Sequence, residues 1–207
     1  MIGGDMITYR PDIQVLDATI RDGGLVNDFY FTDEFIHNLY KANVKAGVDY
    51  MEFGYKASKE LFDVNKFGKW KFCDDEDIRA VVGDNNTDLK IAVMADVGRC
   101  NYKQDIKPRA ESPVDVIRVA TYINQIPAAV DVIEDAVAKG YEVTCNIMAI
   151  SNAQEADIRV ALFRCIFSFG MFFGIIRVYT VVFSDPAQVS PVTGHLDQNR
   201  SRHVSKR

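Results

Sequence analysis

The sequence is poor in the residues that build disulfide frameworks and zinc sites. Its 207 residues include four cysteines and three histidines, and no Cys-x-x-Cys pair occurs. The cysteines are widely spaced, at Cys73, Cys100, Cys145 and Cys165. This spacing argues against a disulfide framework or a zinc site, and it favours a reducing cytoplasm. The first residues, MIGGDMITYRPD, also lack the apolar stretch of a secretory signal.

An excess of basic residues and a long apolar run are missing as well. The formal net charge is −5, whereas a nucleic-acid binder carries a basic surface. The apolar run between Arg164 and Arg177 has 12 residues, too few to span a bilayer. The rest of the composition, 48% hydrophobic and 26% charged, is typical of a globular domain. We therefore expect a cytoplasmic protein whose partner is a small molecule, not a nucleic acid or a membrane; homo-oligomerisation stays open.

The composition changes near residue 162. Residues 1–162 carry 18 basic and 27 acidic side chains, whereas residues 163–207 carry 6 basic and 2 acidic ones. Six of the 13 phenylalanines fall within residues 163–183, and no apolar periodicity follows them. We interpret the change as a frameshift, a mispredicted gene end or a truncation. The alternative is a divergent C-terminus that completes a small α/β domain.

Short apolar runs alternate with amphipathic stretches along the first 160 residues. The runs that we predict to be strands are Ile13–Ile20, Val48–Gly54, Leu89–Ala95, Val114–Ala120 and Tyr141–Ile147, with Ile175–Phe183 as a sixth on composition alone. Strands alternating with helices predict parallel βαβ units with right-handed crossovers.

Helix signals fill the intervals between these runs. One helix is predicted to begin at an N-cap, Thr32, and to end at Gly47; others begin near Asp74, cover Asn124–Lys139 and begin at about Ala153. The two architectures that fit are an open doubly wound sheet and a TIM barrel. No GxGxxG follows the first run, which disfavours a dinucleotide-binding sheet.

Charged residues end four successive strand-like runs: Arg21 with Asp22, then Glu52, Asp96 and Arg118. Buried parallel strands are almost continuously apolar, so such residues need a reason. In a TIM barrel the carboxyl ends of the strands form the active face. The pattern therefore predicts a site at this edge of the sheet.

The residue types of this predicted site suit the chemistry of a 2-oxo acid. Asp22 is a hard oxygen ligand suited to Mg²⁺ or Mn²⁺, and Arg21 offers fixed donors to a carboxylate or an enolate oxygen. Glu52 would orient a water molecule or Arg21, and the group would hold the charge of a forming enolate. The alternative is an Arg–Asp turn with Glu52 paired to a neighbouring lysine.

The segment Tyr55–Phe72 exceeds the usual βα loop of about 2–6 residues. Its five lysines and its aromatic residues would cover an anionic substrate as a lid; the alternative is a solvated basic loop anchored by Trp70. Cys73 is expected to pack rather than to act as a nucleophile, and His37 is expected at the surface.

Two motifs carry a resemblance to a known family. LDATIRDGG (Leu16–Gly24) followed by YMEFGY (Tyr50–Tyr55) resembles the DRE-TIM metallolyase superfamily, which includes 3-hydroxy-3-methylglutaryl-CoA lyase and 4-hydroxy-2-oxovalerate aldolase. The sequence is most similar to the bacterial aldolase catalytic domain proteins, which have RDGG, a following Asn (here Asn27) and a WxFC segment (here Trp70–Cys73). The resemblance covers about residues 12–160. It implies an α/β fold, a TIM-type (β/α) barrel incomplete at its C-terminal side, with 12–162 as a partial catalytic domain and 163–207 as a divergent tail.

The resemblance also implies an activity and roles for single residues. Arg21 corresponds to the enolate-stabilising arginine, Asp22 to a metal ligand and Glu52 to the glutamate of the second strand, while Asp96 and Arg118 fall at strand ends that line the substrate pocket. The implied enzyme is a carbon–carbon lyase, an aldolase, or an acyltransferase acting on a 2-oxo acid such as pyruvate through an enolate. Its implied cofactor is a divalent metal, Mg²⁺ or Mn²⁺.

The sequence departs from the family at two points. The His-x-His pair of the family's metal site is missing, and Leu25 stands where 4-hydroxy-2-oxovalerate aldolases carry a catalytic histidine. A catalytically inactive truncated barrel, or a binding module without those metal ligands, is therefore the alternative function.

Overall fold

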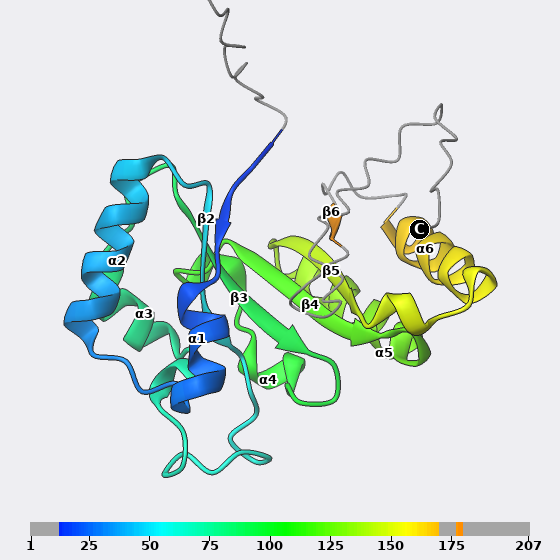
Figure 1. Ribbon diagram of the computed structural model, residues 1–207, viewed down its shortest axis with the longest axis horizontal. Coiled ribbons are helices and arrows are strands. Elements are labelled where there is room, and N and C mark those ends of the chain that lie inside the picture. The colour runs from blue at the N-terminus through cyan, green and yellow to red at the C-terminus, as the bar shows by residue number, and fades with distance from the viewer. Residues whose placement is uncertain (1–12, 170–176, 180–207) are drawn as a thin grey trace, which may run out of the picture.

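The computed structural model describes residues 13–169 and 177–179, and strands and helices alternate through them (Figure 1). The strands are β1 (Leu16–Asp17), β2 (Tyr50–Tyr55), β3 (Lys90–Asp96), β4 (Val116–Tyr122), β5 (Glu142–Met148) and β6 (Arg177–Tyr179). The α-helices are α1 (Thr19–Asn27), α2 (Asp33–Ala46), α3 (Asp75–Val82), α4 (Tyr102–Asp105), α5 (Ile126–Ala138) and α6 (Glu155–Phe169). Short 3₁₀ turns, including η1 (Lys69–Lys71), lie between them.

All the described strands are parallel and pair in the order of the chain, from β1 to β6. A doubly wound sheet would reverse its strand order at the first strand, and no such reversal occurs here. Strands β1 to β5 form a curled half-barrel (Figure 1). The fold is therefore α/β and consistent with an incomplete TIM-type barrel, as the sequence predicted.

Side chains alternate between the two faces of this sheet with the period of two that strands impose. The outer face packs against the helices through apolar residues such as Met51, Val93 and Ile117, which belong to the main core. The inner face carries Tyr50, Ala92 and Val116, which form a separate small cluster, together with charged side chains. The core thus lies between sheet and helices, and the inner face is left for the site.

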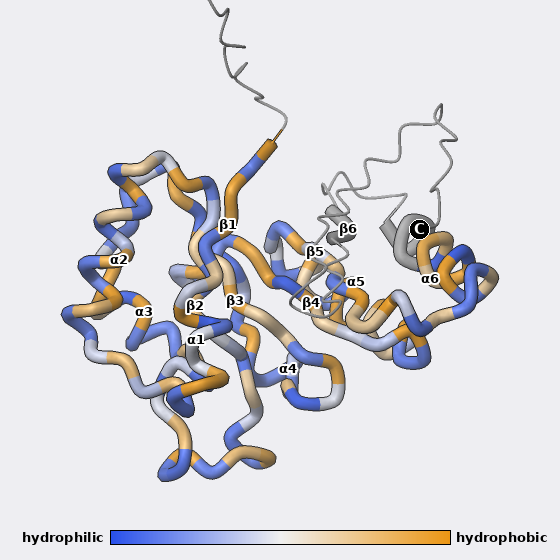
Figure 2. The backbone as a smooth tube through the Cα atoms, viewed as in Figure 1, coloured by the Kyte–Doolittle hydropathy of each residue, from blue (hydrophilic) through white to orange (hydrophobic). Residues whose placement is uncertain are grey.

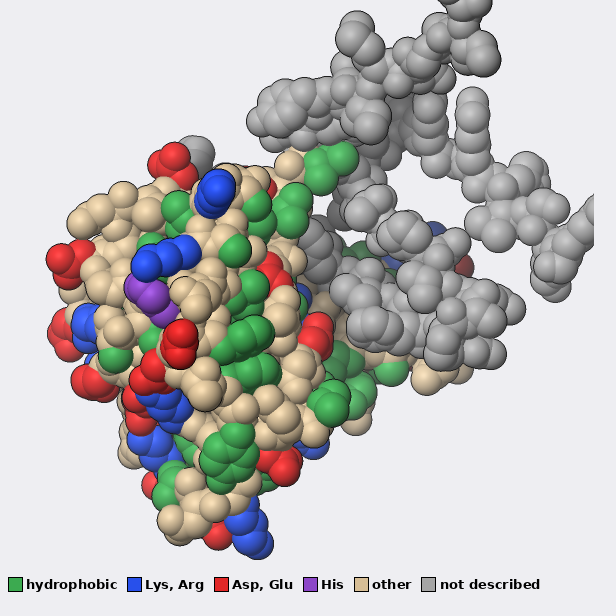
Figure 3. All heavy atoms as spheres, turned by 60° about the vertical axis from the view of Figure 1, so that its left-hand side comes forward, with side chains coloured by type: hydrophobic (Ala, Val, Ile, Leu, Met, Phe, Trp, Pro, Cys, Tyr) green, Lys and Arg blue, Asp and Glu red, His purple; other side chains and the backbone are tan. Residues whose placement is uncertain are grey.

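The helix signals in the sequence agree with the observed helix ends. The Thr32 hydroxyl accepts a hydrogen bond from Phe35 N at 3.2 Å and caps α2, and Gly47 ends this helix with a φ of 70°. Asp74 precedes the first residue of α3. Hydrophilic and hydrophobic residues alternate along α2 (Figure 2), and the face that α2 and α3 present to solvent intersperses acidic and basic side chains (Figure 3).

One expectation is corrected by the structure. The first strand covers only Leu16–Asp17, because Asp17 Oδ1 accepts a hydrogen bond from Thr19 N at 3.0 Å and the chain turns at once into α1. Arg21 and Asp22 consequently lie on a helix rather than at a strand end. His37 lies at the surface, as expected, but is half-buried, because its Nδ1 lies 2.7 Å from Val81 O and links α2 to α3.

The C-terminal part is described only in pieces. Helix α6 continues to Phe169, and β6 pairs with β5 within the run predicted as a sixth strand. The irregular segment predicted over 184–207 lies outside the described residues. Of the helices in the described ranges, none is both long enough and apolar enough to cross a membrane.

Candidate active site

Three charged side chains from three elements meet at the inner face of the half-barrel. Arg21 Nε on α1 donates a hydrogen bond to Glu52 Oε2 on β2 at 2.9 Å, and Arg118 Nη1 on β4 donates to the same oxygen at 2.6 Å. The Glu52 side chain is fully buried, and those of Arg21 and Arg118 are 16% and 7% exposed. We call these three residues the Arg–Glu–Arg cluster.

The strand register explains how residues so far apart in sequence come together. Glu52 lies beside Ala92 of β3, and Ala92 lies beside Val116 of β4. Because the Ala92 side chain is only a methyl group, Arg118 can reach across β3 to Glu52. The β2–β3 register also shifts between Glu52 and Tyr55, an irregularity of the kind found beside active sites.

The Arg–Glu–Arg cluster presents guanidinium donors, and its charge is balanced by a second carboxylate, because Arg21 also pairs with Asp22. Two guanidinium groups face the Glu52 carboxylate. Burial alone would lower the pKa of Arg21, but the charge and the hydrogen bond of Glu52, with the charge of Asp22, raise this pKa above its ordinary value. Glu52 Oε1 and Arg118 Nε are buried, and within the described residues neither has a hydrogen-bond partner. Since an unsatisfied buried polar atom costs about 1–3 kcal/mol, these atoms mark a place for a ligand or water. Guanidinium donors suit a carboxylate or an enolate oxygen.

Tyr55 adjoins this cluster, and the sequence assigned it no role in the site. It lies close enough to Arg21 for the two groups to affect each other's charge, and its ring meets Phe29 edge-on with centroids 5.6 Å apart. Burial raises the pKa of Tyr55, and the charge of Arg21 opposes that rise. Tyr55 can therefore hold a proton beside the cluster. In the sequence, Tyr55 directly follows Glu52, Phe53 and Gly54. Because we predicted a loop to begin at Tyr55, its place beside the site was missed.

Asp22 has a different environment from the one expected for a metal ligand. Its Oδ1 lies 2.5 Å from Arg21 Nη1, and half of its side chain is exposed. Across residues 13–169 and 177–179, no group of three or more His, Cys, Asp or Glu side chains is placed to hold a metal ion. Glu52, the other carboxylate of the predicted site, is already bound by two guanidinium groups. The residues described here thus do not form a divalent-cation site by themselves.

The other predicted pocket residues differ in their places along the strands: Asp96 is the last residue of β3, as predicted, whereas Arg118 is the third residue of β4 and not at a strand end. Arg118 belongs to the cluster itself, whereas Asp96 ends β3 and pairs with Arg99 at 3.6 Å. Burial raises the pKa of Asp96, opposed by Arg99 and Lys71. Glu52 pairs with arginines, so the alternative in which it binds a lysine is wrong.

The segment after β2 is anchored at its ends, and most of its residues from Lys59 to Lys66 are exposed. Trp70 is fully buried, with its ring 5.6 Å from that of Phe53. Three of the lysines form ion pairs: Lys56 with Asp75 at 2.8 Å, Lys59 with Asp74 at 2.6 Å, and Lys69 with Asp33 at 2.7 Å. These lysines are thus not free to bind an anionic substrate. Cys73 packs as expected: it is buried, its Sγ lies 3.2 Å from Trp70 O, and burial raises the pKa of its thiol.

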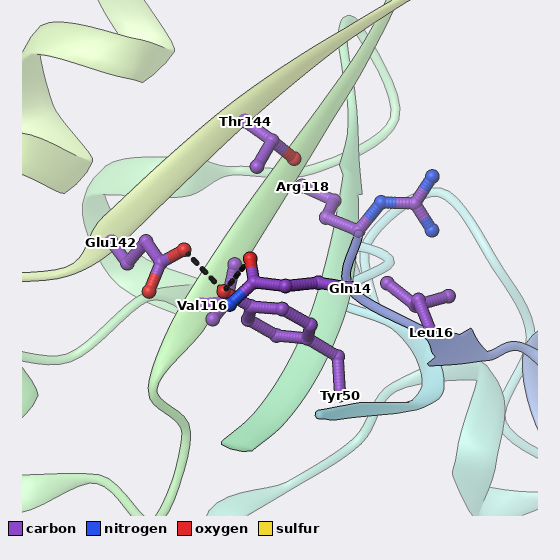
Figure 4. A pocket seen from close by; sticks show the side chains of 7 residues that line it. All are labelled: Gln14, Leu16, Tyr50, Val116, Arg118, Glu142 and Thr144. Atoms are coloured by element: carbon purple, nitrogen blue, oxygen red, sulfur yellow. Dashed lines mark hydrogen bonds between the residues drawn. The ribbon is translucent and has the colours of Figure 1, made fainter. Parts of the chain in front are cut away.

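A cavity of about 180 Å³ opens on the inner face beside the cluster, near the starts of the strands. Figure 4 shows its lining side chains, with the Arg118 guanidinium at one end and Tyr50 at the other. The Tyr50 hydroxyl donates to Glu142 Oε1 at 2.9 Å, an interaction that joins β2 to β5 across the cavity floor. Arg118 is therefore shared by the cavity and the cluster.

Comparisons with known proteins point to aldolases. Over 143 residues, or 69% of this chain, the sequence is 25% identical to 4-hydroxy-2-oxovalerate aldolase 6 of Rhodococcus jostii, and the match spans 39% of that protein's length. The crystal structure of the N-terminal domain of a proposed aldolase from Bacteroides vulgatus is similar with a TM-score of 0.53 and 18% identity, over 81% of this chain and 63% of that one. No family model matches the chain. The chain is thus a distant homologue of an aldolase and shares its fold with an aldolase N-terminal domain.

Proposed function

We propose that this chain forms the enolate-stabilising part of an aldolase-type active site, acting as a carbon–carbon lyase or acyltransferase on a 2-oxo acid such as pyruvate. The observation that carries the proposal is the Arg–Glu–Arg cluster. It is largely buried and lies on the inner face of a parallel half-barrel, where Glu52 and Arg118 are the third residues of β2 and β4 and Arg118 also borders the cavity. The distant homology to an aldolase supports the same class of reaction.

The cluster would act through fixed donors. Cleavage of the carbon–carbon bond next to a 2-oxo group leaves an electron pair that is delocalised onto the oxygen as an enolate. Arg21 and Arg118 would hold the substrate carboxylate and this oxygen, and Glu52 would keep both guanidinium groups in place. Donors positioned before the reaction stabilise the developing charge most effectively. Tyr55 would supply or accept the proton.

A divalent metal, Mg²⁺ or Mn²⁺, remains part of the family-level expectation. Its ligands would have to come from beyond the described residues, and we assign no step to it. Because the described residues form no metal site, a second candidate function is a module that binds a 2-oxo acid without turning it over.

One experiment distinguishes the two candidate functions. Pyruvate release from a 4-hydroxy-2-oxo acid is measured with a coupled dehydrogenase, with and without Mn²⁺, for the wild type and for Arg21→Ala. Loss of one preorganised donor to the reacting oxygen should lower kcat by about 10²-fold or more. Arg159→Ala is the matched control, since Arg159 is 77% exposed and, among the described residues, pairs with Glu155 of the same helix. Binding without release would favour the binding module, and absence of both would contradict the proposal.

A further inference from the structure

The cavity on the inner face combines apolar walls with a cationic end. Leu16, Tyr50 and Val116 line it from three strands, and they belong to the small apolar cluster of this face. Arg118 lies at one end of the cavity, where the cavity meets the Arg–Glu–Arg cluster (Figure 4). A dry apolar cavity of about 150 Å³ is large enough to bind benzene. At about 180 Å³, this cavity has room for a chain of several carbon atoms.

Two polar side chains of the cavity lining already have partners. The Tyr50 hydroxyl donates to Glu142 Oε1 at 2.9 Å, and Glu142 Oε2 forms an ion pair with Lys90 Nζ at 2.5 Å. Both oxygens of the Glu142 carboxylate are therefore occupied, and neither needs a group from a ligand. A negative charge placed beside Glu142 would be repelled, and it would lose its hydration in an apolar cavity.

Arg118 and Thr144 differ from this pair, because each has a buried polar atom without a partner. The two residues lie side by side on β4 and β5, and they are 6% and 5% exposed. Arg118 Nη1 donates to Glu52, but Arg118 Nε and Thr144 Oγ1 have no hydrogen-bond partner among the described residues. An N–H and an O–H are both donors. Since unsatisfied buried polar atoms are costly, this pair is suited to an acceptor such as a carboxylate.

These observations define the ligand that fits. Among the side chains that line the cavity in the described ranges, Arg118 is the one cation, so it matches a single carboxylate. Arg21 Nε and Arg118 Nη1 donate to the same oxygen of Glu52, so the two guanidinium groups are neighbours. One can bind the carboxylate of a 2-oxo acid and the other its oxo group. The rest of such an acid then points towards the apolar walls.

We propose that the cavity binds an aliphatic chain of the 2-oxo acid, so that the preferred acid is a monocarboxylic one with a longer chain than that of pyruvate; this rests on the function proposed above. The carboxylate accepts hydrogen bonds from Arg118 and Thr144. The chain, from C3 onwards, packs on Leu16, Tyr50 and Val116. These three side chains are the specificity-determining residues, and Thr144 is a further carboxylate-binding residue.

Binding of a series of acids to the wild-type chain tests the proposal. Isothermal titration calorimetry is carried out with oxalate, pyruvate, 2-oxobutanoate and 2-oxopentanoate. From pyruvate onwards the affinity should rise about fourfold for each added methylene, the factor that corresponds to burial of one CH₂. 2-Oxohexanedioate, which ends in a second carboxylate, should bind at least about tenfold more weakly than 2-oxohexanoate. Because the series uses the wild type, it does not depend on how any variant folds.

Three variants locate the effect. Leu16→Phe adds bulk inside the cavity, so the ratio of the 2-oxopentanoate affinity to the pyruvate affinity should fall towards one. Val15→Phe is the matched control, since the neighbouring Val15 is 54% exposed and does not line the cavity, and the ratio should stay at the wild-type value. Thr144→Val keeps the shape of the side chain but removes its hydroxyl, so all the acids should bind several-fold more weakly.

The possible results separate this proposal from the proposed function. If oxalate and pyruvate bind but the affinity does not rise with chain length, the proposal is overturned and the proposed function stands; the cavity is then filled by another part of the protein. If no acid binds, oxalate included, the proposed function fails as well. A rise with chain length that persists in Leu16→Phe would also overturn the proposal, because the chain would then bind elsewhere.

Discussion

The two faces of the sheet differ sharply in what their side chains do. On β4, Ile117 and Val119 face the helices and are fully buried in the main core. Val116 and Arg118 of the same strand face inward, towards the cavity and the Arg–Glu–Arg cluster. A period of two in the sequence thus separates packing from chemistry. Charges at inward positions are informative because packing does not require them there.

Removal of the shared carboxylate should have the largest effect on the inner face. In Glu52→Ala two buried guanidinium groups lose their only common partner, and breaking such a buried pair costs about 3–5 kcal/mol of unfolding free energy. Urea unfolding measures the loss. Glu155→Ala is the control, since Glu155 is 79% exposed on α6 and pairs with the equally exposed Arg159, so its loss should cost about 1 kcal/mol or less. Equal losses in the two variants would mean that the cluster is not a buried unit.

A truncation on the outer face should reduce stability without changing the chemistry. Ile117→Ala removes a fully buried side chain from the core and should cost about 2–5 kcal/mol in urea unfolding. Anion binding per folded molecule should stay at the wild-type level, because no atom of Ile117 faces the site. Weaker binding by the folded variant would break the separation between the two faces.

Glycine substitutions should distinguish a close approach from open space. Gly54→Ala would place Cβ 1.9 Å from Trp70 O, so η1 must move, at a cost of about 1–3 kcal/mol. Gly23→Ala lies on α1 with its nearest neighbour, Phe31 Cζ, at 3.4 Å, and should stabilise the helix by about 0.4–1 kcal/mol. Thermal unfolding gives both values. A Gly54→Ala variant as stable as wild type would show that η1 does not pack on β2.

The smallest expected effect concerns Asp96 and is seen only in its pH dependence. Burial raises the pKa of this carboxyl, so the folded state holds the proton more tightly than the unfolded state does. Wild-type stability should therefore fall relative to that of Asp96→Asn as pH rises from about 4 towards neutral. Unfolding at a series of pH values measures this slope. The opposite slope would mean that the ion pair with Arg99 outweighs burial.

Periodic features of the fold could be predicted from the sequence. Apolar runs and caps such as Thr32 and Gly47 locate most strands and helices, because they depend on local backbone geometry. The short first strand was missed because one side-chain hydrogen bond, from Thr19 N to Asp17, ends it. The alternation of polar and apolar residues along a strand does not reveal where a side chain will accept a backbone hydrogen bond and end the strand.

The site residues also fall into those that the sequence predicted and those that it did not. The structure brings Arg21 and Glu52 together, as their positions after successive strands suggested. The position of η1 over β2 could not be read from the sequence, since it depends on the close approach of Trp70 O to Gly54. That approach is a tertiary contact between residues with no shared periodicity.

The most direct test of the central claim is binding of oxalate, a planar dianion that mimics an enolised 2-oxo acid, measured by isothermal titration calorimetry. The account predicts that the wild-type chain binds oxalate and that Arg21→Ala and Arg118→Ala each weaken it at least about tenfold, a loss of about 1.4 kcal/mol. Arg159→Ala should bind like the wild type. Equal affinity in all four proteins would contradict the claim that the Arg–Glu–Arg cluster is an anion-binding centre.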